Sequence, residues 1–167
     1  PYMFFTTKEP GLTAAMRWTA ADGSSYVIGH DVRLIDIAEF TTRMIVGTHG
    51  KAALFLKEGK LIAPPRDERF SDHQTISQAL LKTSEELELP EFAEAYRLWQ
   101  TNPKPARALY TFAGTDGRWV SLFRRLDSNI ASGIWLGVVA PEDDFVPISR
   151  DDLLLLGRAS RLRQRGD

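Results

Sequence analysis

One short apolar stretch near the end of the chain, residues 134–140, constrains the fold more than any other feature. It carries no charge, contains β-branched residues and a tryptophan, and is shorter than a typical helix. Pro141 ends it. The pattern predicts a buried central strand.

Two further strand-like stretches precede this one. Residues 106–114 and 118–126 are separated by Thr115, Asp116 and Gly117, and an Asp-Gly pair supplies the positive φ angles of a tight hairpin. Together with residues 134–140 they predict three antiparallel strands that share one apolar face.

Length and charge exclude several classes of protein. A chain of 167 residues suits one domain, or one complete module and a fragment. Lys plus Arg (21) nearly balance Asp plus Glu (22), so nothing favours a nucleic-acid partner. Without cysteine there is no disulfide, thiolate metal site or thiol nucleophile. No apolar run reaches the roughly 18 residues of a membrane span and no signal peptide is present, and because the chain begins at Pro1 we expect a fragment of a longer protein.

The first third of the chain predicts an incomplete sheet. Residues 2–5 form a short aromatic strand, and Pro10-Gly11 is a strong chain breaker. Residues 12–19 and 26–34 are strand-like and flank a second Asp-Gly turn at 21–24. These strands lack the rest of their sheet.

The middle of the chain alternates between helices and a hairpin. Apolar spacing predicts helices over residues 36–46, 71–89 and from Pro90 to Asn102. Residues 51–56 and 60–62 predict a hairpin between the first two helices. The succession of two strands, helices and three strands is typical of a PAS-like module in the α+β class, a five-stranded antiparallel sheet with flanking helices.

Four segments resemble double Cache domains, the extracytoplasmic sensors of bacterial membrane receptors. The first two are YVIGHDVRLIDIAEF (26–40) and GKAALFLKEGKLIAPP (50–65). The others are the opening PYMFFTTKEPGLTAAMRW and the ending from DGRWVSLFRRL to GIWLGVVAPEDDF. The resemblance covers about residues 1–147.

The resemblance implies a division of the chain into four parts. Residues 1–35 would be a remnant of the membrane-distal module, and 36–48 a connecting helix. Residues 49–147 would be a complete membrane-proximal module, and 148–167 a basic helix leading toward the membrane. The signalling helix and first strands of the family would precede Pro1, so we expect the exposed strand edge of residues 1–35 to pair with another chain.

The resemblance also implies a ligand site in the distal remnant. Family members that bind amino acids hold the ammonium with the Asp at the end of a Gly-x-Asp strand and line the pocket with the Tyr of a Pro-Tyr pair. Tyr2 and Asp31 match these positions, whereas Phe4 replaces a second acidic residue. A buried ammonium needs nearby anions, and Asp31 alternatively caps a turn or the following helix.

A second candidate pocket lies in the proximal module. Tyr110 and Trp119, with Phe55, Phe112 and Phe123, would form its walls, although aromatic residues at alternating strand positions are more often core. Its carboxylate-binding candidates are Arg66, His73, Arg107 and Arg124. Because strand side chains alternate, Arg124 and Arg125 must lie on opposite faces.

Metal, cofactor and catalytic sites are not predicted. His30, His49 and His73 lie on three different elements, and the acidic residues 142–144 are interpreted as a solvated turn. No phosphate loop or nucleophile elbow is present, so we expect no enzyme. A cytosolic haem or flavin binder, the third interpretation, would need His49 or His73 as ligand.

The expected function is therefore a periplasmic ligand-sensing domain of an inner-membrane signalling protein, homodimeric and bound to a small molecule. The tail supports a membrane-surface helix or a solvated one: Ser149, Asp151 and Asp152 suit a helix start, and a Leu run and arginines follow. The alternative is a non-catalytic dimerisation or protein-interaction module without a ligand.

Overall fold

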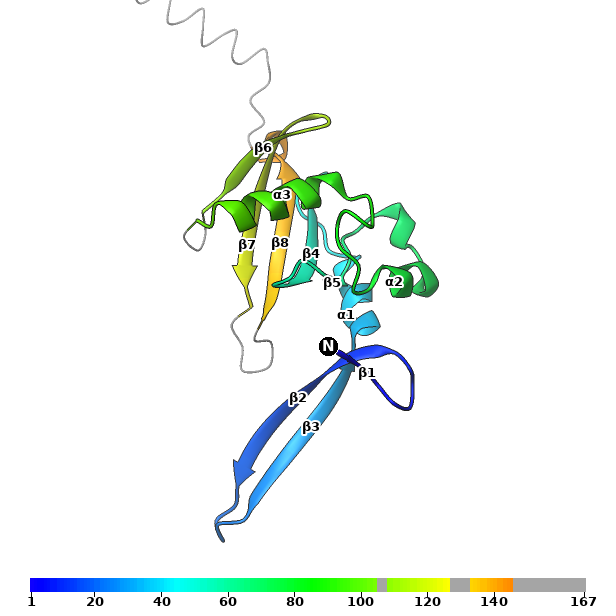
Figure 1. Cartoon of the computed structure of the whole chain (residues 1–167), viewed down its shortest axis with the longest axis vertical. Coiled ribbons are helices and arrows are strands. Elements are labelled where there is room, and N and C mark those ends of the chain that lie inside the picture. The colour runs from blue at the N-terminus through cyan, green and yellow to red at the C-terminus, as the bar shows by residue number, and fades with distance from the viewer. Residues whose placement is uncertain (105–107, 127–132, 146–167) are drawn as a thin grey trace, which may run out of the picture.

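The computed structural model describes residues 1–104, 108–126 and 133–145. The described residues form two sheets joined by a helix, as Figure 1 shows. A long hairpin projects from one end of the molecule, and a five-stranded sheet with its helices forms the larger part. The predicted helix over residues 148–167 lies outside the described residues.

The larger sheet is antiparallel with the order β5-β4-β8-β7-β6. Its strands are β4 (Lys51–Leu56), β5 (Leu61–Ala63), β6 (Tyr110–Gly114), β7 (Gly117–Arg125) and β8 (Ile134–Pro141). The apolar stretch 134–140 is thus the central strand, as predicted: β8 pairs with β4 on one side and with β7 on the other. The predicted fold class, α+β with a five-stranded antiparallel sheet, is confirmed.

Helix α3 (Pro90–Thr101) covers one face of this sheet with aromatic side chains. Trp99 stacks on Phe123 at 5.0 Å between ring centroids and lies 4.6 Å from Trp135. Phe55 contacts Phe92, which is fully buried. Offset and tilted aromatic pairs add to the stabilisation from apolar burial. These aromatic residues are therefore mainly core, the alternative that the sequence left open.

The hairpin consists of β2 (Pro10–Thr19) and β3 (Ser25–Arg33), with β1 (Tyr2–Met3) on the outer edge of β2. Their turn contains Gly23 at φ +86°, as the Asp-Gly pair predicts. Pro10-Gly11 is not a breaker: both residues belong to β2. The ring of Phe4 lies against Gly11, where a Cβ atom would be 2.1 Å from Cζ.

Helix α1 (Leu34–Thr41) stands between the two sheets and packs against β2, β3, β5 and α2 (His73–Ala79). Leu34, Ile35 and Ala38 of α1 are buried in the common core. The helix is shorter than the predicted 36–46. Residues 42–50, which we call the connecting segment, continue from it as a loop to β4.

The prediction of one helix over residues 71–89 is wrong. Helix α2 ends at Ala79, and Leu81 has φ +63°. The backbone then runs beside β5: Leu81 N donates to Leu61 O at 2.7 Å, and Leu61 N to Lys82 O at 2.8 Å. The unpaired edge of β5 needs these partners, and satisfying it outweighs the helical spacing of the leucines. Short η1 (Glu68–Phe70) and η2 (Glu142–Asp144) complete the described elements.

Candidate functional site

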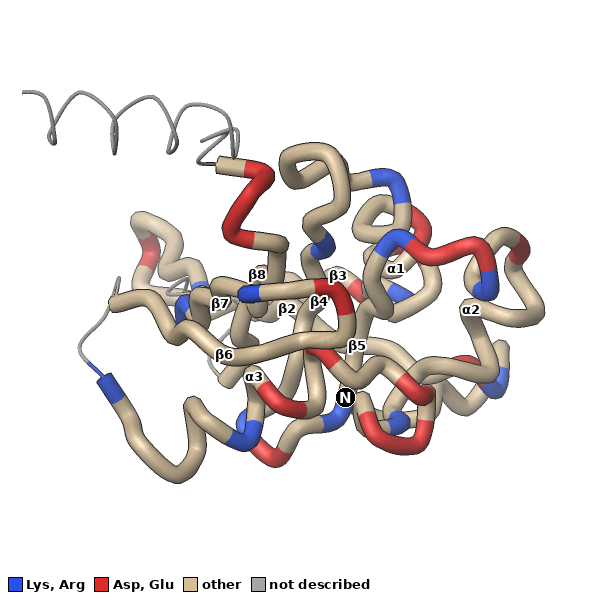
Figure 2. Tube along the Cα trace, turned by 90° about the horizontal axis from the view of Figure 1, so that it is seen from above, with Lys and Arg blue, Asp and Glu red and all other residues tan. Residues whose placement is uncertain are grey.

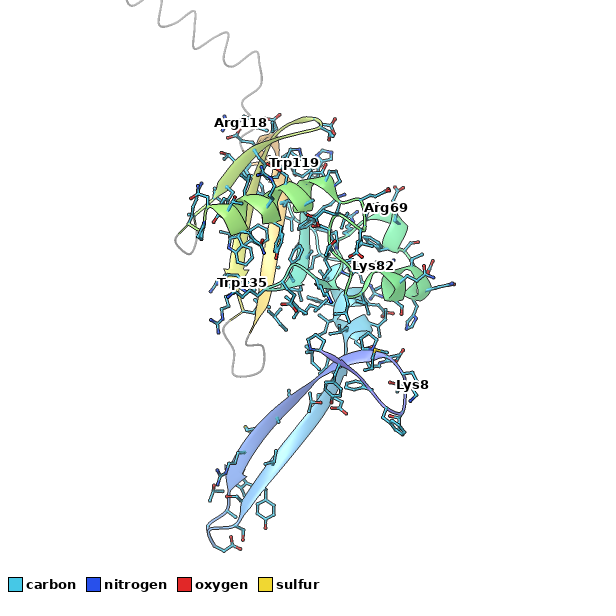
Figure 3. All side chains as sticks on the ribbon, viewed as in Figure 1. Lys8, Arg69, Lys82, Arg118, Trp119 and Trp135 are labelled. Atoms are coloured by element: carbon cyan, nitrogen blue, oxygen red, sulfur yellow. The ribbon has the colours of Figure 1, made fainter. Side chains whose placement is uncertain are left out.

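An open cleft of about 1000 Å³ lies at the end of the five-stranded sheet where β8 ends. The start of β4, the segment 66–69, the β6–β7 turn and η2 form its walls. Figure 3 shows Trp119 at this end of the sheet, next to Arg118. The predicted residues Arg66 and Trp119 both line the cleft.

Asp67 organises one wall of the cleft. Its carboxylate accepts hydrogen bonds from Arg69 Nε (2.9 Å), Arg69 N (3.1 Å) and Lys51 Nζ (3.1 Å), and its side chain is only 14% exposed. The Arg69 side chain above all, helped by Lys51, holds the pKa of Asp67 well below its usual range. Arg69 also donates to Leu87 O at 2.9 Å. These two cations are therefore bound within the protein.

Arg66 is the cation of the cleft that remains available. Among the residues that the structure describes, it has no hydrogen bond or ion pair. It also borders a neighbouring cleft of about 310 Å³, which His73 of α2 lines. Arg66 thus lines two adjoining clefts, one together with Trp119 and the other together with His73.

The other predicted residues of the proximal pocket lie elsewhere. Tyr110 is buried on β6, and its hydroxyl accepts from Lys104 N at 2.7 Å. Arg124 pairs with Leu136 in the sheet register, on the face opposite that of Trp119 and Phe123, so it does not reach the cleft. Arg107 lies outside the described residues. The sheet face that carries Arg124 holds a separate apolar groove of about 400 Å³ next to Phe145.

The hairpin brings Tyr2 and Asp31 together. Thr13 lies between them: its hydroxyl donates to Asp31 Oδ1 at 2.5 Å and contacts the hydroxyl of Tyr2. All three side chains are on the same face of the hairpin, because Thr13 and Asp31 are register partners. They form an exposed polar group with one carboxylate. A ligand role for this group stays a prediction.

The prediction of a solvated turn at residues 142–144 is wrong for Asp144. Its side chain is 5% exposed. Oδ2 accepts from the backbone N–H groups of Thr48 (3.0 Å), His49 (2.7 Å) and Gly50 (3.1 Å), while Oδ1 lies 3.0 Å from His49 Nδ1. We call this group the Asp144 clamp. The backbone hydrogen bond from His49, first among these contacts, lowers the pKa of Asp144.

Sequence reasoning missed Asp144 because its partners lie far away in the sequence and are mostly backbone groups. It also missed Asp67, although Arg69 follows two residues later and only Lys51 is farther away. The three donors of the clamp are 94 to 96 residues away from Asp144. The nearest signal was the pair Gly47 and Gly50 around them, which marks an unusual loop. No group of metal-ligating side chains is found in the described part of the chain.

Figure 2 shows basic and acidic residues interspersed along the described chain. None of the described helices has the length and apolar character to cross a membrane.

Comparison with known proteins gives matches in structure alone. No protein-family model matches the sequence, and no curated protein matches it. The ligand-binding domain of the Pseudomonas fluorescens chemoreceptor CtaA, solved with L-isoleucine, aligns with a TM-score of 0.53 and 15% identity over 89% of this chain and 53% of that one. The sensory domain of the Campylobacter jejuni chemoreceptor Tlp3, with isoleucine bound, aligns with a TM-score of 0.51 and 13% identity over 86% and 47%.

These matches establish the fold. The chain has the fold of chemoreceptor ligand-binding domains, and the predicted resemblance to bacterial sensor modules is confirmed at that level. It spans about half the length of the solved domains that it matches.

Proposed function

We propose that the chain is an extracytoplasmic ligand-sensing part of a bacterial transmembrane signalling protein, which binds a small molecule without transforming it. The fold supports this role, since it is shared with sensor domains that were solved with isoleucine. The carrying observation is the cleft of the five-stranded sheet, where Arg66 stands without a partner among the described residues beside buried Trp119.

The chemistry of the cleft suits a small carboxylate. The Arg66 guanidinium has no partner among the described residues, and a guanidinium can take a carboxylate with two parallel hydrogen bonds. Trp119 provides an apolar wall, and pockets of this kind combine apolar walls with a few polar groups. The ligand would bind one conformation of the cleft better than another and shift the population of the receptor toward it.

The hairpin offers a second place for the same function. Tyr2, Thr13 and Asp31 present a carboxylate to a ligand ammonium, in accord with the family resemblance. Membrane attachment through residues 148–167 and relay to an output domain belong to this proposal as well.

The test is a thermal-shift and calorimetry screen of the chain against isoleucine, leucine, valine, simple carboxylates and amines. A ligand present at 100 times its dissociation constant stabilises a protein by about 2.7 kcal/mol. Loss of binding in Arg66→Ala would locate the site in the cleft, and loss in Asp31→Ala in the hairpin. Arg97→Ala is the control, because Arg97 is exposed on α3 and pairs locally with Glu94.

A non-catalytic interaction module is the second candidate, and the hairpin favours it. Side chains on one face of β2 and β3 are apolar and exposed, namely Met16, Trp18, Tyr26 and Ile28. Such a patch on a soluble protein marks a contact surface. If the screen yields no ligand while the chain is folded, this candidate replaces the sensor.

A further inference from the structure

The Asp144 clamp joins the chain that enters the five-stranded sheet to the chain that leaves it. Residues 48–50 close the connecting segment and lead into β4, whereas Asp144 ends the turn that follows β8. These two strands are neighbours, and their outermost register pair at this end is Lys51 with Val139. The clamp extends the link between the entering and the leaving chain beyond that pair.

The connecting segment is shaped around the carboxylate. Three consecutive backbone N–H groups converge on a single oxygen, an arrangement that forms an anion-binding concavity. Gly47 has φ +56°, and a Cβ atom there would lie 2.8 Å from Asp144 Oδ2. Val46 and Gly50 are bridged across the loop. The carboxylate therefore fills a site that the loop is built to offer.

The clamp is also connected to the hairpin. Helix α1 packs against β2 and β3 on one side and against β5 and α2 on the other. Its last residue, Thr41, directly precedes the connecting segment. The chain from the hairpin to the Asp144 clamp therefore runs through α1 and residues 42–50.

We propose that the Asp144 clamp couples movement of α1 and the connecting segment to the chain that leaves β8. Charge-assisted hydrogen bonds to a nearly buried carboxylate are short and strong, so the joined segments move together. This coupling goes beyond the proposed sensing function and holds whichever site binds a ligand.

The experiment compares amide hydrogen exchange in the whole chain and in two matched variants, Asp144→Asn and Asp143→Asn. Each variant removes one negative charge from the same turn, but Asp143 is exposed and makes no hydrogen bond within the described residues. In Asp144→Asn we expect exchange at residues 48–50 to rise about tenfold or more, with parallel increases over residues 42–47 and at Phe145. Asp143→Asn should leave all of these unchanged.

Two outcomes overturn the proposal. Unchanged protection at residues 48–50 would mean that the carboxylate does not hold them. An increase in amide exchange confined to residues 48–50 would mean that the carboxylate only caps these amides and does not couple the connecting segment to the chain after β8. The amides of Ala53 and Val139 report global unfolding. If they also exchange faster in Asp144→Asn, the milder variant His49→Ala is compared instead, because it removes only the contact between the ring and Asp144. His49→Ala should then raise exchange in residues 42–50 and at Phe145, by less than Asp144→Asn does.

Discussion

Two carboxylates hold distant segments of this molecule together. Asp67 joins β4 to the segment before α2 through Lys51 and Arg69, and Asp144 joins the connecting segment to the end of β8. Both side chains are mostly withdrawn from solvent. Hydrogen bonds to ionised groups are stronger than those between neutral groups, particularly when water is excluded.

Replacement of Asp67 should destabilise the fold. Asp67→Ala leaves Lys51 and Arg69 without their common partner, but both cations are partly exposed and regain water. We expect a loss of about 1–2 kcal/mol in the free energy of unfolding, measured by urea titration. Asp116→Ala, an exposed carboxylate on the β6–β7 turn, should stay within about 0.5 kcal/mol. Equal effects of the two substitutions would contradict a special role for Asp67.

Titration of Asp67 should contribute to the pH dependence of the free energy of unfolding. Its pKa is lowered in the folded state, so the unfolded chain takes up the proton first. Ionised Asp67 contributes its full stabilisation above the ordinary pKa of an Asp, about 4, and this stabilisation is lost as the pH falls below that value. Between about pH 4 and pH 2 the wild type should therefore lose more stability than Asp67→Ala, as followed by thermal midpoints. Parallel curves would exclude the carboxylate as the titrating group.

Individual residues could be predicted where a local pattern identifies them. The Pro-Tyr and Gly-x-Asp patterns selected Tyr2 and Asp31, which the hairpin register does bring to Thr13. Arg66 and Trp119 line the same cleft, and their role in ligand binding stays a prediction. Asp144 could not be predicted because nothing near it in sequence shows which distant backbone groups it binds. For Asp67, the neighbouring Arg69 was a local signal, and only the bond to Lys51 is hidden in the fold.

At the scale of elements, the strands were easier to predict than the helices. Asp-Gly turns and alternating apolar residues identified both the β2–β3 and the β6–β7 hairpins. Residues 71–89 have a helical spacing, yet the backbone of Leu81 pairs with Leu61 instead. Local periodicity cannot reveal that the short strand β5 lacks a second neighbour.

The two faces of the β2–β3 hairpin differ in a way that can be tested. Met16 pairs with Ile28 and Trp18 with Tyr26 on the apolar face, whereas Val27 pairs with Arg17 on the polar face. We expect Ile28→Lys to lower self-association of the chain, measured by light scattering over a concentration series, because it places a charge in the contact. Val27→Lys, next to it on the opposite face, should have no effect. Identical behaviour of both variants would remove the apolar face as a contact surface.

At the scale of the whole molecule, the two sheets should differ in stability. A hairpin of two long strands with exposed faces is marginally stable by itself, while β8 is paired on both sides and covered by α3. In native-state hydrogen exchange, the amides of β2 and β3 should become accessible through local openings of low free energy. The amides of β8 should exchange only with an opening free energy close to that of global unfolding. Similar protection in both sheets would show that the hairpin folds as one unit with the rest.

The neighbouring positions of β4 and β8 have a consequence for how such a unit can be joined to other domains. The strand that begins the larger sheet and the strand that completes it lie side by side, so the polypeptide enters and leaves at nearly the same place. Units with adjacent ends can be inserted into a host chain or repeated in tandem with little disturbance to the flanking structure. We therefore expect such a unit to keep its own core when it is joined to other domains at these adjacent ends.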